Sequence, residues 1–256
     1  MSPEIERRLS DGAAAEKWAP STYNHYRSLM MLVYREARRA GKVLVNPARD
    51  VRHRREDNSR VRFLTSTEET KLREVIQDNW PEHSPEFELA ISTGLRKGSM
   101  YALTWPMVDW TGRMLNIPTS KNGEALHIPL NAAALAALKV VYQRGDGTGR
   151  VFESAKTGNP LQNGRHWFDA AVKKAQVADF RFHDLRHHFA SKLRQAGAKL
   201  EDISELLCHK SLSMSRRYAH LGPNQLHEVV SRLDSNSTPV APEPKPASET
   251  LASYVN

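Results

Sequence analysis

Residues 107–130 constrain the fold most, because they replace the helical periodicity of their surroundings with an alternation of apolar and polar positions. Two short runs, Met114–Ile117 and Ala125–Ile128, flank Lys121-Asn122-Gly123-Glu124. Asn-Gly between two such runs is the strongest short-range signal for a β-hairpin, since its turn needs residues that tolerate positive φ. We therefore expect one small antiparallel sheet in a chain that is otherwise helical.

The other patterned segments have helical spacing. The clearest runs from about Thr22 to Arg39, with Ser21 as its expected N-cap and Gly41 as its stop. Its apolar side carries Leu29, Met30, Val33 and Ala37. Further helices are expected from Thr65, over 85–92, from Ala132, and over 164–176, 184–195, 201–207, 211–218 and 223–233. The expected fold class is α+β, mainly α-helical.

Composition excludes several classes of protein. Hydrophobic residues make up 39% of the 256 residues, which is enough for a packed core. A single cysteine, Cys208, cannot form an intramolecular disulfide and favours a reducing compartment. The chain has no apolar run of membrane-spanning length and a charged start, so we expect a cytoplasmic protein without a membrane partner. Its net charge of +8 permits a polyanionic partner.

The charge is concentrated at the front of the chain. Residues 1–62 hold 14 Lys+Arg against 8 Asp+Glu, and the stretch Val51–Arg62 is polar, basic and without periodicity. We expect that stretch to be a linker. The predicted organisation is a helical unit with linker over 1–58, a second domain over 63–233, and a proline-rich, disordered tail over 234–256.

The segment His183–His188 carries the densest set of chemically useful side chains. His183 and Arg186 are three residues apart, so they share a face near a helix N-terminus, where free N–H groups and the helix dipole favour an anion. Together with Arg96 and His209 they would offer a phosphate several donors. A tyrosine nearby could be a nucleophile if cationic neighbours favoured its phenolate form.

Taken singly, each of these residues has an ordinary structural explanation. Tyr218 would be a half-buried core aromatic, Lys121 a solvated turn lysine and Cys208 a small buried hydrophobe. Spacing alone does not bring distant segments together. Local chemistry therefore leaves open whether these side chains form one site.

The ordered set of motifs resembles the tyrosine recombinases, the phage integrase family. The motifs are Thr93-Gly94-Leu95-Arg96-Lys97-Gly98, Lys121 in the hairpin, His183-Asp184-Leu185-Arg186-His187, Leu206-Leu207-Cys208-His209, and Arg217-Tyr218-Ala219-His220. Their order and spacing match over about residues 63–233. The resemblance implies a recombinase catalytic domain, preceded by a partial helical core-type DNA-binding domain that is shorter than usual.

Carried over residue by residue, the resemblance implies six catalytic residues. They are Arg96, Lys121, His183, Arg186, His209 and Tyr218. The two arginines would clamp the scissile phosphate, and the lysine would protonate the leaving 5′-oxygen. The first histidine would assist proton transfer and the second would contact the phosphate. The tyrosine would attack and form a 3′-phosphotyrosine.

The chain departs from the family pattern at three positions near these residues. Cys208 stands where glycine is usual, Ser99 where an acidic residue is common, and Ser215 where threonine is frequent. We expect the loop before the second histidine to pack differently and one supporting contact after the arginine turn to be lost. None of the six catalytic positions is substituted.

The resemblance also implies partners. We expect double-stranded DNA as substrate, a homotetramer on paired DNA sites, a monomer or weak dimer without DNA, and no cofactor or metal. The element served would be a phage or another mobile element. The candidate DNA-binding residues in the basic front segment are Arg27, Arg35, Arg38, Arg39, Arg52, Arg54 and Arg55.

Two other functions compete with this interpretation. His183-Asp184-Leu185-Arg186-His187 approximates the H-E-x-x-H motif of zinc hydrolases, although an arginine would then share a turn with a divalent cation. A non-catalytic DNA-binding accessory protein would need only the basic front of the chain. Zinc content would identify the first, and a covalent protein–DNA adduct would exclude the second.

Overall fold

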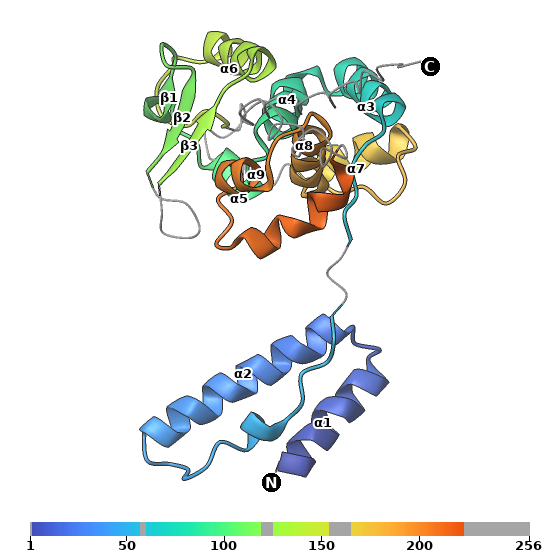
Figure 1. Ribbon diagram of the computed structural model, residues 1–256, viewed down its shortest axis with the longest axis vertical. Helices are drawn as coiled ribbons and strands as arrows, with labels where there is room; N and C mark the ends of the chain where they lie inside the picture. Colours follow the sequence, from blue (N-terminus) through green and yellow to red (C-terminus); the bar gives the residue numbers. More distant parts are fainter. Residues whose placement is uncertain (1, 57–59, 119–124, 154–164, 223–256) are drawn as a thin grey trace, which may run out of the picture. The chain divides into compact units, whose positions relative to one another are not determined.

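The chain forms two compact units, Met1–Arg60 and Val61–Asn256. The computed structural model describes residues 2–56, 60–118, 125–153 and 165–222 (Figure 1). Each unit is considered by itself below.

The first unit consists of two helices and a short 3₁₀ turn. These are α1 (Ser2–Ala15), α2 (Pro20–Arg39) and η1 (Pro47–Asp50). Helix α1 was not expected from the sequence. Helix α2 begins after Ala19, which makes no side-chain cap hydrogen bond, so the prediction of Ser21 as N-cap is wrong. Gly41, at φ 68°, ends α2 as expected, because glycine adopts this left-handed conformation without steric cost.

The first part of the expected linker Val51–Arg62 is packed against the first unit. Val51 is 1% exposed and joins a small core with Leu9, Ala13 and Tyr23. Asn24 donates to the carbonyl of Arg54 (2.7 Å) and accepts from its N–H (2.8 Å). Residues 51–56 therefore belong to the first unit, because one apolar side chain and one asparagine tie them to α2.

The second unit contains the sheet and the remaining helices. The helices are α3 (Ser66–Asn79), α4 (Ser84–Thr93), α5 (Lys97–Tyr101), α6 (Ala132–Arg144), α7 (Arg165–Lys174), α8 (Asp184–Gln195) and α9 (Leu200–Leu206). Short 3₁₀ segments are η2 (Pro81–His83), η3 (Trp105–Met107), η4 (Leu212–Met214) and η5 (Arg216–Leu221). The helix expected over 211–218 is therefore wrong, because this stretch forms η4 and η5 instead.

The predicted hairpin strands are present in an antiparallel sheet ordered β1 (Val108–Asp109), β2 (Met114–Ile117), β3 (Leu126–Pro129). Leu115 pairs with Ile128, and both are buried, while Asn116 pairs with His127 on the exposed face. The alternation in the sequence thus sets the register. The Asn-Gly turn lies outside the described residues.

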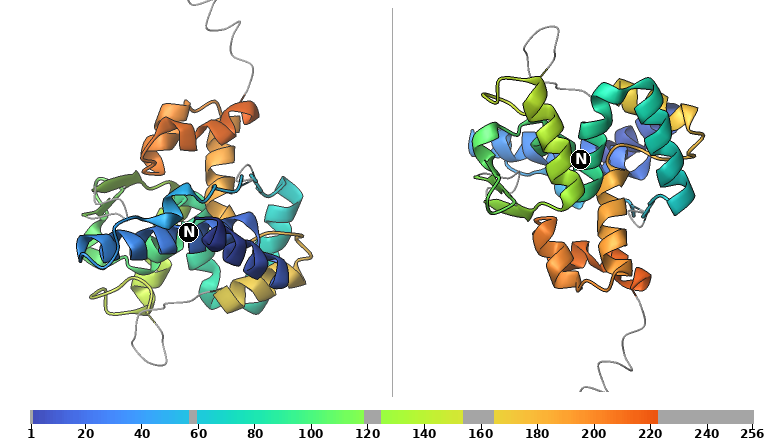
Figure 2. Two further views of the ribbon diagram at one scale, coloured as in Figure 1. Left: turned by 90° about the horizontal axis from the view of Figure 1, so that it is seen from below. Right: turned by 90° about the horizontal axis from the view of Figure 1, so that it is seen from above.

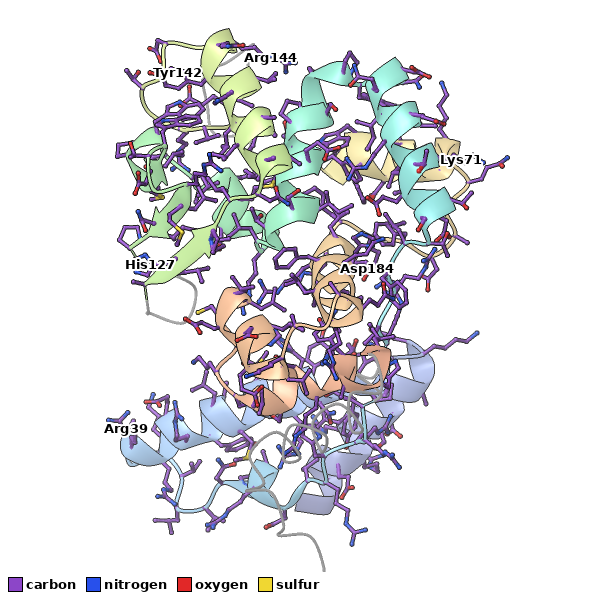
Figure 3. The ribbon with its side chains drawn as sticks, turned by 45° about the horizontal axis from the view of Figure 1, so that its top comes forward. Arg39, Lys71, His127, Tyr142, Arg144 and Asp184 are labelled. Carbon is purple, nitrogen blue, oxygen red and sulfur yellow. The ribbon has the colours of Figure 1, made fainter. Side chains whose placement is uncertain are left out.

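A large apolar core, together with a smaller apolar cluster on α8, α9 and η5, holds the second unit together. Helix α4 packs against both α6 and α8, and Figure 2 shows α4 beside α6. Helix α3 starts at Thr65 with a capping box to Glu68, as its sequence indicates. Helix α8 begins at Asp184, whose carboxylate accepts from the N–H of Arg181 (2.8 Å) (Figure 3). These elements fix the end of α8 that carries the candidate site residues.

Candidate active site

Arg186 ties three separate segments of the chain together. It is 5% exposed, and its guanidinium donates to the carbonyl of Gly94 (2.8 Å) and to that of Leu207. Gly94 caps the C-terminus of α4 two residues before Arg96, and Leu207 caps that of α9 two residues before His209. A guanidinium has five N–H donors, so these two bonds leave three for an anion.

The expected catalytic residues that the structure describes gather around this point. Burial and the positive charge of Arg96 lower the pKa of Arg186 to about 10, so the guanidinium stays charged at neutral pH. Partial burial of the ring is the main cause that lowers the pKa of His183, and the positive charge of Arg186 is the next. The residue nevertheless remains exposed to solvent. Arg217 acts on the same histidine and was not among the expected site residues.

His209 is oriented by a serine that the sequence did not single out for this role. Its Nδ1 lies 2.8 Å from Oγ of Ser215, which is fully buried. Burial and the charges of Arg186 and Arg96 lower the pKa of His209 to about 4. The ring is therefore neutral at physiological pH, and one ring nitrogen remains available toward the arginines.

Tyr218 is buried beside the arginines rather than displayed at the surface. It is 1% exposed and packs with Ala190, Ile203 and Leu207. Burial raises its pKa, against the opposing charges of Arg217 and Arg186, so the phenol keeps its proton at neutral pH. Its Oη lies 2.6 Å from Nδ1 of His187, a contact between residues 31 positions apart.

Cys208 occupies a position where the backbone favours glycine. It lies two residues after Leu206, the last residue of α9, with φ 48°, and its N–H donates to the carbonyl of Glu205 (2.8 Å). The N–H of His209 donates to Ser204 (2.9 Å), which completes a Schellman motif. The family's usual glycine is thus explained by conformation, and a cysteine here carries a cost of about 1–2 kcal/mol.

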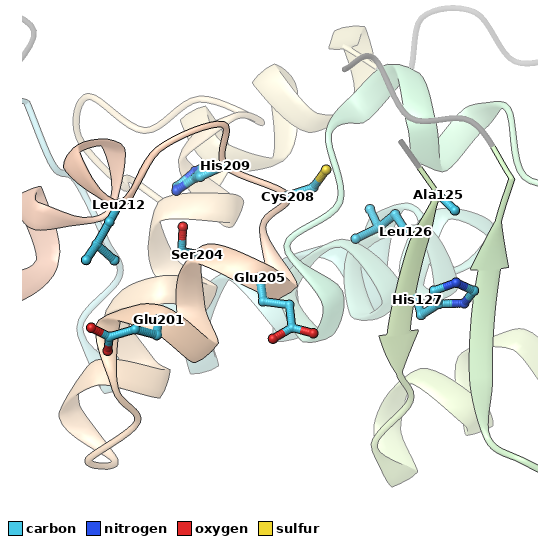
Figure 4. A pocket seen from close by; sticks show the side chains of 9 residues that line it. All are labelled: Ala125, Leu126, His127, Glu201, Ser204, Glu205, Cys208, His209 and Leu212. Atoms are coloured by element: carbon cyan, nitrogen blue, oxygen red, sulfur yellow. The ribbon is translucent and has the colours of Figure 1, made fainter. Parts of the chain in front are cut away.

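A pocket of about 450 Å³ adjoins His209, between β3 and α9 (Figure 4). Its lining residues are Ala125, Leu126, His127, Glu201, Ser204, Glu205, Cys208, His209 and Leu212. His209 and Cys208 lie on the loop after α9, and His127 lies across the pocket on β3. Of the expected catalytic residues, His209 therefore borders a pocket on the hairpin side, which Glu201 and Glu205 also line.

A buried histidine, His188, connects α8 to the first residues of the second unit. His188 is 2% exposed; its Nδ1 accepts from the N–H of Leu64 (3.1 Å), and its Nε2 lies 3.3 Å from Glu69. The hydrogen bond from His188 is the largest cause that lowers the pKa of Glu69 to about 2. The start of the second unit is thus linked to α8, one residue after His187.

The expected site residues in the rest of the chain have mixed outcomes. Lys121 lies outside the described residues. In the first unit, Arg27 donates to the carbonyl of Val51 (2.6 Å) and Arg54 lies over the ring of Tyr23 (3.8 Å). These two arginines support packing.

The other expected DNA-binding arginines are exposed. They are Arg35, Arg38, Arg39, Arg52 and Arg55. Arg39 lies at the end of α2 (Figure 3), and Glu36 pairs with both Arg35 (3.1 Å) and Arg39 (3.5 Å). Arg38, Arg52 and Arg55 are not paired with Glu36 and are therefore better placed to contribute net positive charge.

The zinc interpretation is not supported in the described parts of the chain. There, no three His, Cys, Asp or Glu side chains come together in a group that could hold a metal ion. His187 is directed to Tyr218 instead of forming a ligand pair with His183, and the two imidazole rings meet edge to face at 5.4 Å. The described helices also include none that is long and apolar enough to cross a membrane.

The fold and the site define a mainly helical domain with a cluster of arginines and histidines around a buried tyrosine. The sequence model of the phage integrase family matches residues 61–225. This chain belongs to the phage integrase family.

Two curated relatives show how much of the family's architecture the chain covers. The integrase of Salmonella phage P22 is 32% identical over 229 residues, which are 85% of this chain and 58% of the relative. The shufflon-specific DNA recombinase of Escherichia coli is 30% identical over 196 residues, 76% of this chain and 48% of the relative. The chain thus spans about half the length of these relatives.

Solved structures share the fold. A lambda integrase (75–356) dimer bound to a COC′ core site has a TM-score of 0.68 at 25% identity, with 84% of this chain and 80% of that chain covered. The Tn1549 transposon integrase in complex with a circular intermediate DNA also reaches 0.68, at 17% identity, covering 92% and 84% of the two chains. The second likeness concerns the fold alone.

Proposed function

We propose that this protein is a site-specific DNA recombinase that breaks and rejoins double-stranded DNA through a covalent 3′-phosphotyrosine. The observation that carries the proposal is the convergence of Arg96, His183, Arg186, His209 and Tyr218 from distant segments on one place in the second unit. The two curated relatives described above, an integrase and a DNA recombinase, agree with it.

The chemistry follows from the residues. The hydroxyl of Tyr218 attacks the phosphorus and gives up its proton to neutral His183, the residue to which the resemblance assigns proton transfer. The bond to the 5′-oxygen breaks, and that oxygen takes a proton from Lys121. Arg96 and Arg186 stabilise the charge that builds up on the non-bridging oxygens, and neutral His209 donates a hydrogen bond to one of them. One phosphodiester is exchanged for a phosphotyrosine, so bond energy is conserved for rejoining and the exchange needs neither a nucleotide nor a metal cofactor.

We also propose an assembly. A lambda integrase tetramer bound to a Holliday junction is similar to this chain, with a TM-score of 0.66 at 25% identity. By analogy, this protein acts as a homotetramer on paired sites of a phage or another mobile element, is a monomer or weak dimer without DNA, and works in the cytoplasm.

A covalent trap tests the proposal. Duplexes from a library of candidate sites, nicked so that the cleaved strand escapes, are incubated with the full chain and resolved on a denaturing gel. We expect an adduct with the natural sequence and none with Tyr218→Phe, whose binding to the same duplex persists. An adduct that still forms with Tyr218→Phe would overturn the assignment.

A second substrate isolates the role of Lys121. Lys121→Ala should fail on a normal duplex but recover on a duplex whose leaving group is a 5′-thiol, which needs no protonation. Arg96→Ala should not recover on the thiol duplex, because it affects charge on the phosphate. Equal recovery of both variants would contradict the assignment of Lys121.

Salt dependence tests the proposed DNA-binding arginines. Removing one phosphate contact lowers the slope of log affinity against log salt by about 1. We expect this loss for Arg38→Ala and for Arg52→Ala, which remove exposed arginines. Arg7→Ala is the control, because Arg7 is paired with Glu4 (3.0 Å) on α1. A slope unchanged by the first two variants would exclude these residues from the interface.

A further inference from the structure

The nucleophile proposed above has no route to a DNA phosphate in the position it occupies. Tyr218 is 1% exposed, so its hydroxyl is covered along with the ring. Attack requires the oxygen to come within about 3–3.5 Å of the phosphorus on a line with the leaving group. A duplex cannot enter the apolar cluster of Ala190, Ile203 and Leu207, so Tyr218 must move before it reacts.

One polar contact holds the hydroxyl in this covered position. Nδ1 of His187 lies 2.6 Å from Oη of Tyr218. Burial, followed by the charges of His183 and Arg217, lowers the pKa of His187 to about 4, so the ring is neutral. In the tautomer with its proton on Nε2, Nδ1 accepts a hydrogen bond and the hydroxyl of Tyr218 donates it.

His187 is a poor candidate for the base that removes the proton. The pKa of Tyr218 is raised above its ordinary value, whereas that of His187 is lowered to about 4. Proton transfer between them is strongly uphill, and the bond keeps the tyrosine in its unreactive, protonated form.

The segment that carries Tyr218 is suited to movement. It is the six-residue 3₁₀ helix η5, whose N-cap Ser215 accepts the N–H of Tyr218 (3.0 Å). A 3₁₀ helix has poorer hydrogen-bond geometry than an α-helix and is used in short pieces. Helix η5 packs against α8, and the hydroxyl of Tyr218 contacts His187 of that helix.

We propose that His187, which is outside the six expected catalytic residues, is a positioning residue that holds Tyr218 in a covered resting position. Release of this hydrogen bond precedes attack on the phosphate. The inference rests on the proposed function, because it assumes that Tyr218 is the nucleophile.

A matched pair of substitutions separates the hydrogen bond from the shape of the side chain. His187→Asn places an acceptor oxygen near the position of Nδ1, and His187→Leu has nearly the same shape with no acceptor. His220→Leu is the control, because His220 is an exposed histidine on the same 3₁₀ helix. Tyr218 accessibility is measured without DNA, by nitration with tetranitromethane and peptide mass spectrometry.

We expect Tyr218 in His187→Leu to be nitrated about 3- to 10-fold faster than in the natural protein, the factor that one hydrogen bond of typical net strength provides. His187→Asn and His220→Leu should keep the natural rate. Single-turnover cleavage of the trapping duplex should rise by a similar factor in His187→Leu and stay near the natural rate in His187→Asn.

Three results would overturn the inference. First, Tyr218 could stay protected from nitration in His187→Leu, which would show that the apolar cluster alone keeps it covered. Both variants at His187 could expose Tyr218 equally, so that ring shape and not the acceptor would matter. Cleavage could fall in His187→Leu while Tyr218 is exposed. A different outcome is that nitration follows the expected pattern but no variant forms an adduct with DNA. That result would overturn the proposed function and would still support the role of His187 in keeping Tyr218 covered.

Discussion

The two units of the chain differ in how they are held together. The first unit has a small core built around Leu9, Ala13, Tyr23 and Val51, and it leaves Leu29 and Val33 about half exposed on α2. The second unit buries a continuous core under its sheet and helices. The proposed catalytic residues that the structure describes lie in the unit with the larger core, whereas the proposed DNA-binding arginines lie in the smaller unit and are mostly exposed. The two units thus differ in how much buried core supports the residues proposed for function.

The largest expected effect comes from Arg186, because it joins the core of the second unit to the site. Arg186→Ala removes the proposed phosphate donor and also leaves the carbonyls of Gly94 and Leu207 without this partner. We expect single-turnover cleavage to fall about 10²–10³-fold or more. Unfolding of the second unit should become easier by about 1–3 kcal/mol per orphaned buried group.

The control for that variant is Arg181→Ala, which removes an exposed arginine three residues before α8. Cleavage by Arg181→Ala should remain within about threefold of the natural rate, and its melting temperature should not change. If Arg186→Ala kept both its rate and its stability, the idea that one buried guanidinium serves site and fold would be wrong.

The next effect should be confined to the first unit. Tyr23 is 2% exposed, lies under the guanidinium of Arg54, and dominates a small core. Tyr23→Ala should cost about 3–5 kcal/mol, enough to unfold the first unit at room temperature. Hydrogen exchange should show lost protection in α1 and α2 with unchanged protection in α4 and α8. Loss of protection in both units would show that they fold as one.

The second unit should also weaken in mild acid. The pKa of His187 and that of His209 are both lowered to about 4, mainly by burial, against about 6.5 in the unfolded chain. The unfolded chain therefore binds more protons between pH 4 and 6.5, and the free energy of unfolding falls as pH falls through this window. Taken at full weight, the two lowered pKa values correspond to roughly 6 kcal/mol at pH 4. Both rings are partly solvent-exposed, so screening reduces the expected loss to about 2 kcal/mol for the two groups together.

Melting temperature measured from pH 7.5 to pH 4 checks this expectation. His209→Gln should flatten the curve in the same window, because it removes one of the two groups. A natural protein whose second unit melts at the same temperature at pH 7 and pH 4.5 would contradict the burial of these histidines.

The smallest effect concerns the left-handed residue at the end of α9. Cys208→Ala keeps the strained backbone and loses the sulfur, whereas Cys208→Gly also relieves the strain at φ 48°. We expect the glycine variant to be more stable than the alanine variant by about 1 kcal/mol, despite its smaller side chain. Chemical denaturation of both variants measures the difference, and an alanine variant that is equally stable would contradict the strain.

Local sequence patterns predicted the structure correctly where the interactions that determine it lie within one short segment. The alternating runs around Asn122-Gly123 predicted the pairing of β2 with β3, and Thr65 with Glu68 predicted the start of α3. Helix α1 was missed because Leu9 and Ala13, the side chains described as part of its core, do not form a clear apolar stripe in the sequence.

In the candidate site, too, some features could be predicted from the sequence and others could not. The resemblance named Arg96, Arg186 and Tyr218, but neither spacing nor motif indicated that His187 would contact a residue 31 positions away. The roles of Ser215 and of the Arg186 bonds to carbonyls also depend on tertiary packing. Contacts between distant segments are decided by the core, which a single sequence does not display.

The most direct test of the account is the identity of the residue joined to DNA. The trapped adduct is digested with nuclease and trypsin, and the peptide that retains a nucleotide is sequenced by mass spectrometry. We expect the nucleotide on Tyr218, within the tryptic peptide that spans residues 218–232. A nucleotide on Tyr23, Tyr101 or any serine would contradict the central claim that Tyr218 attacks the phosphate.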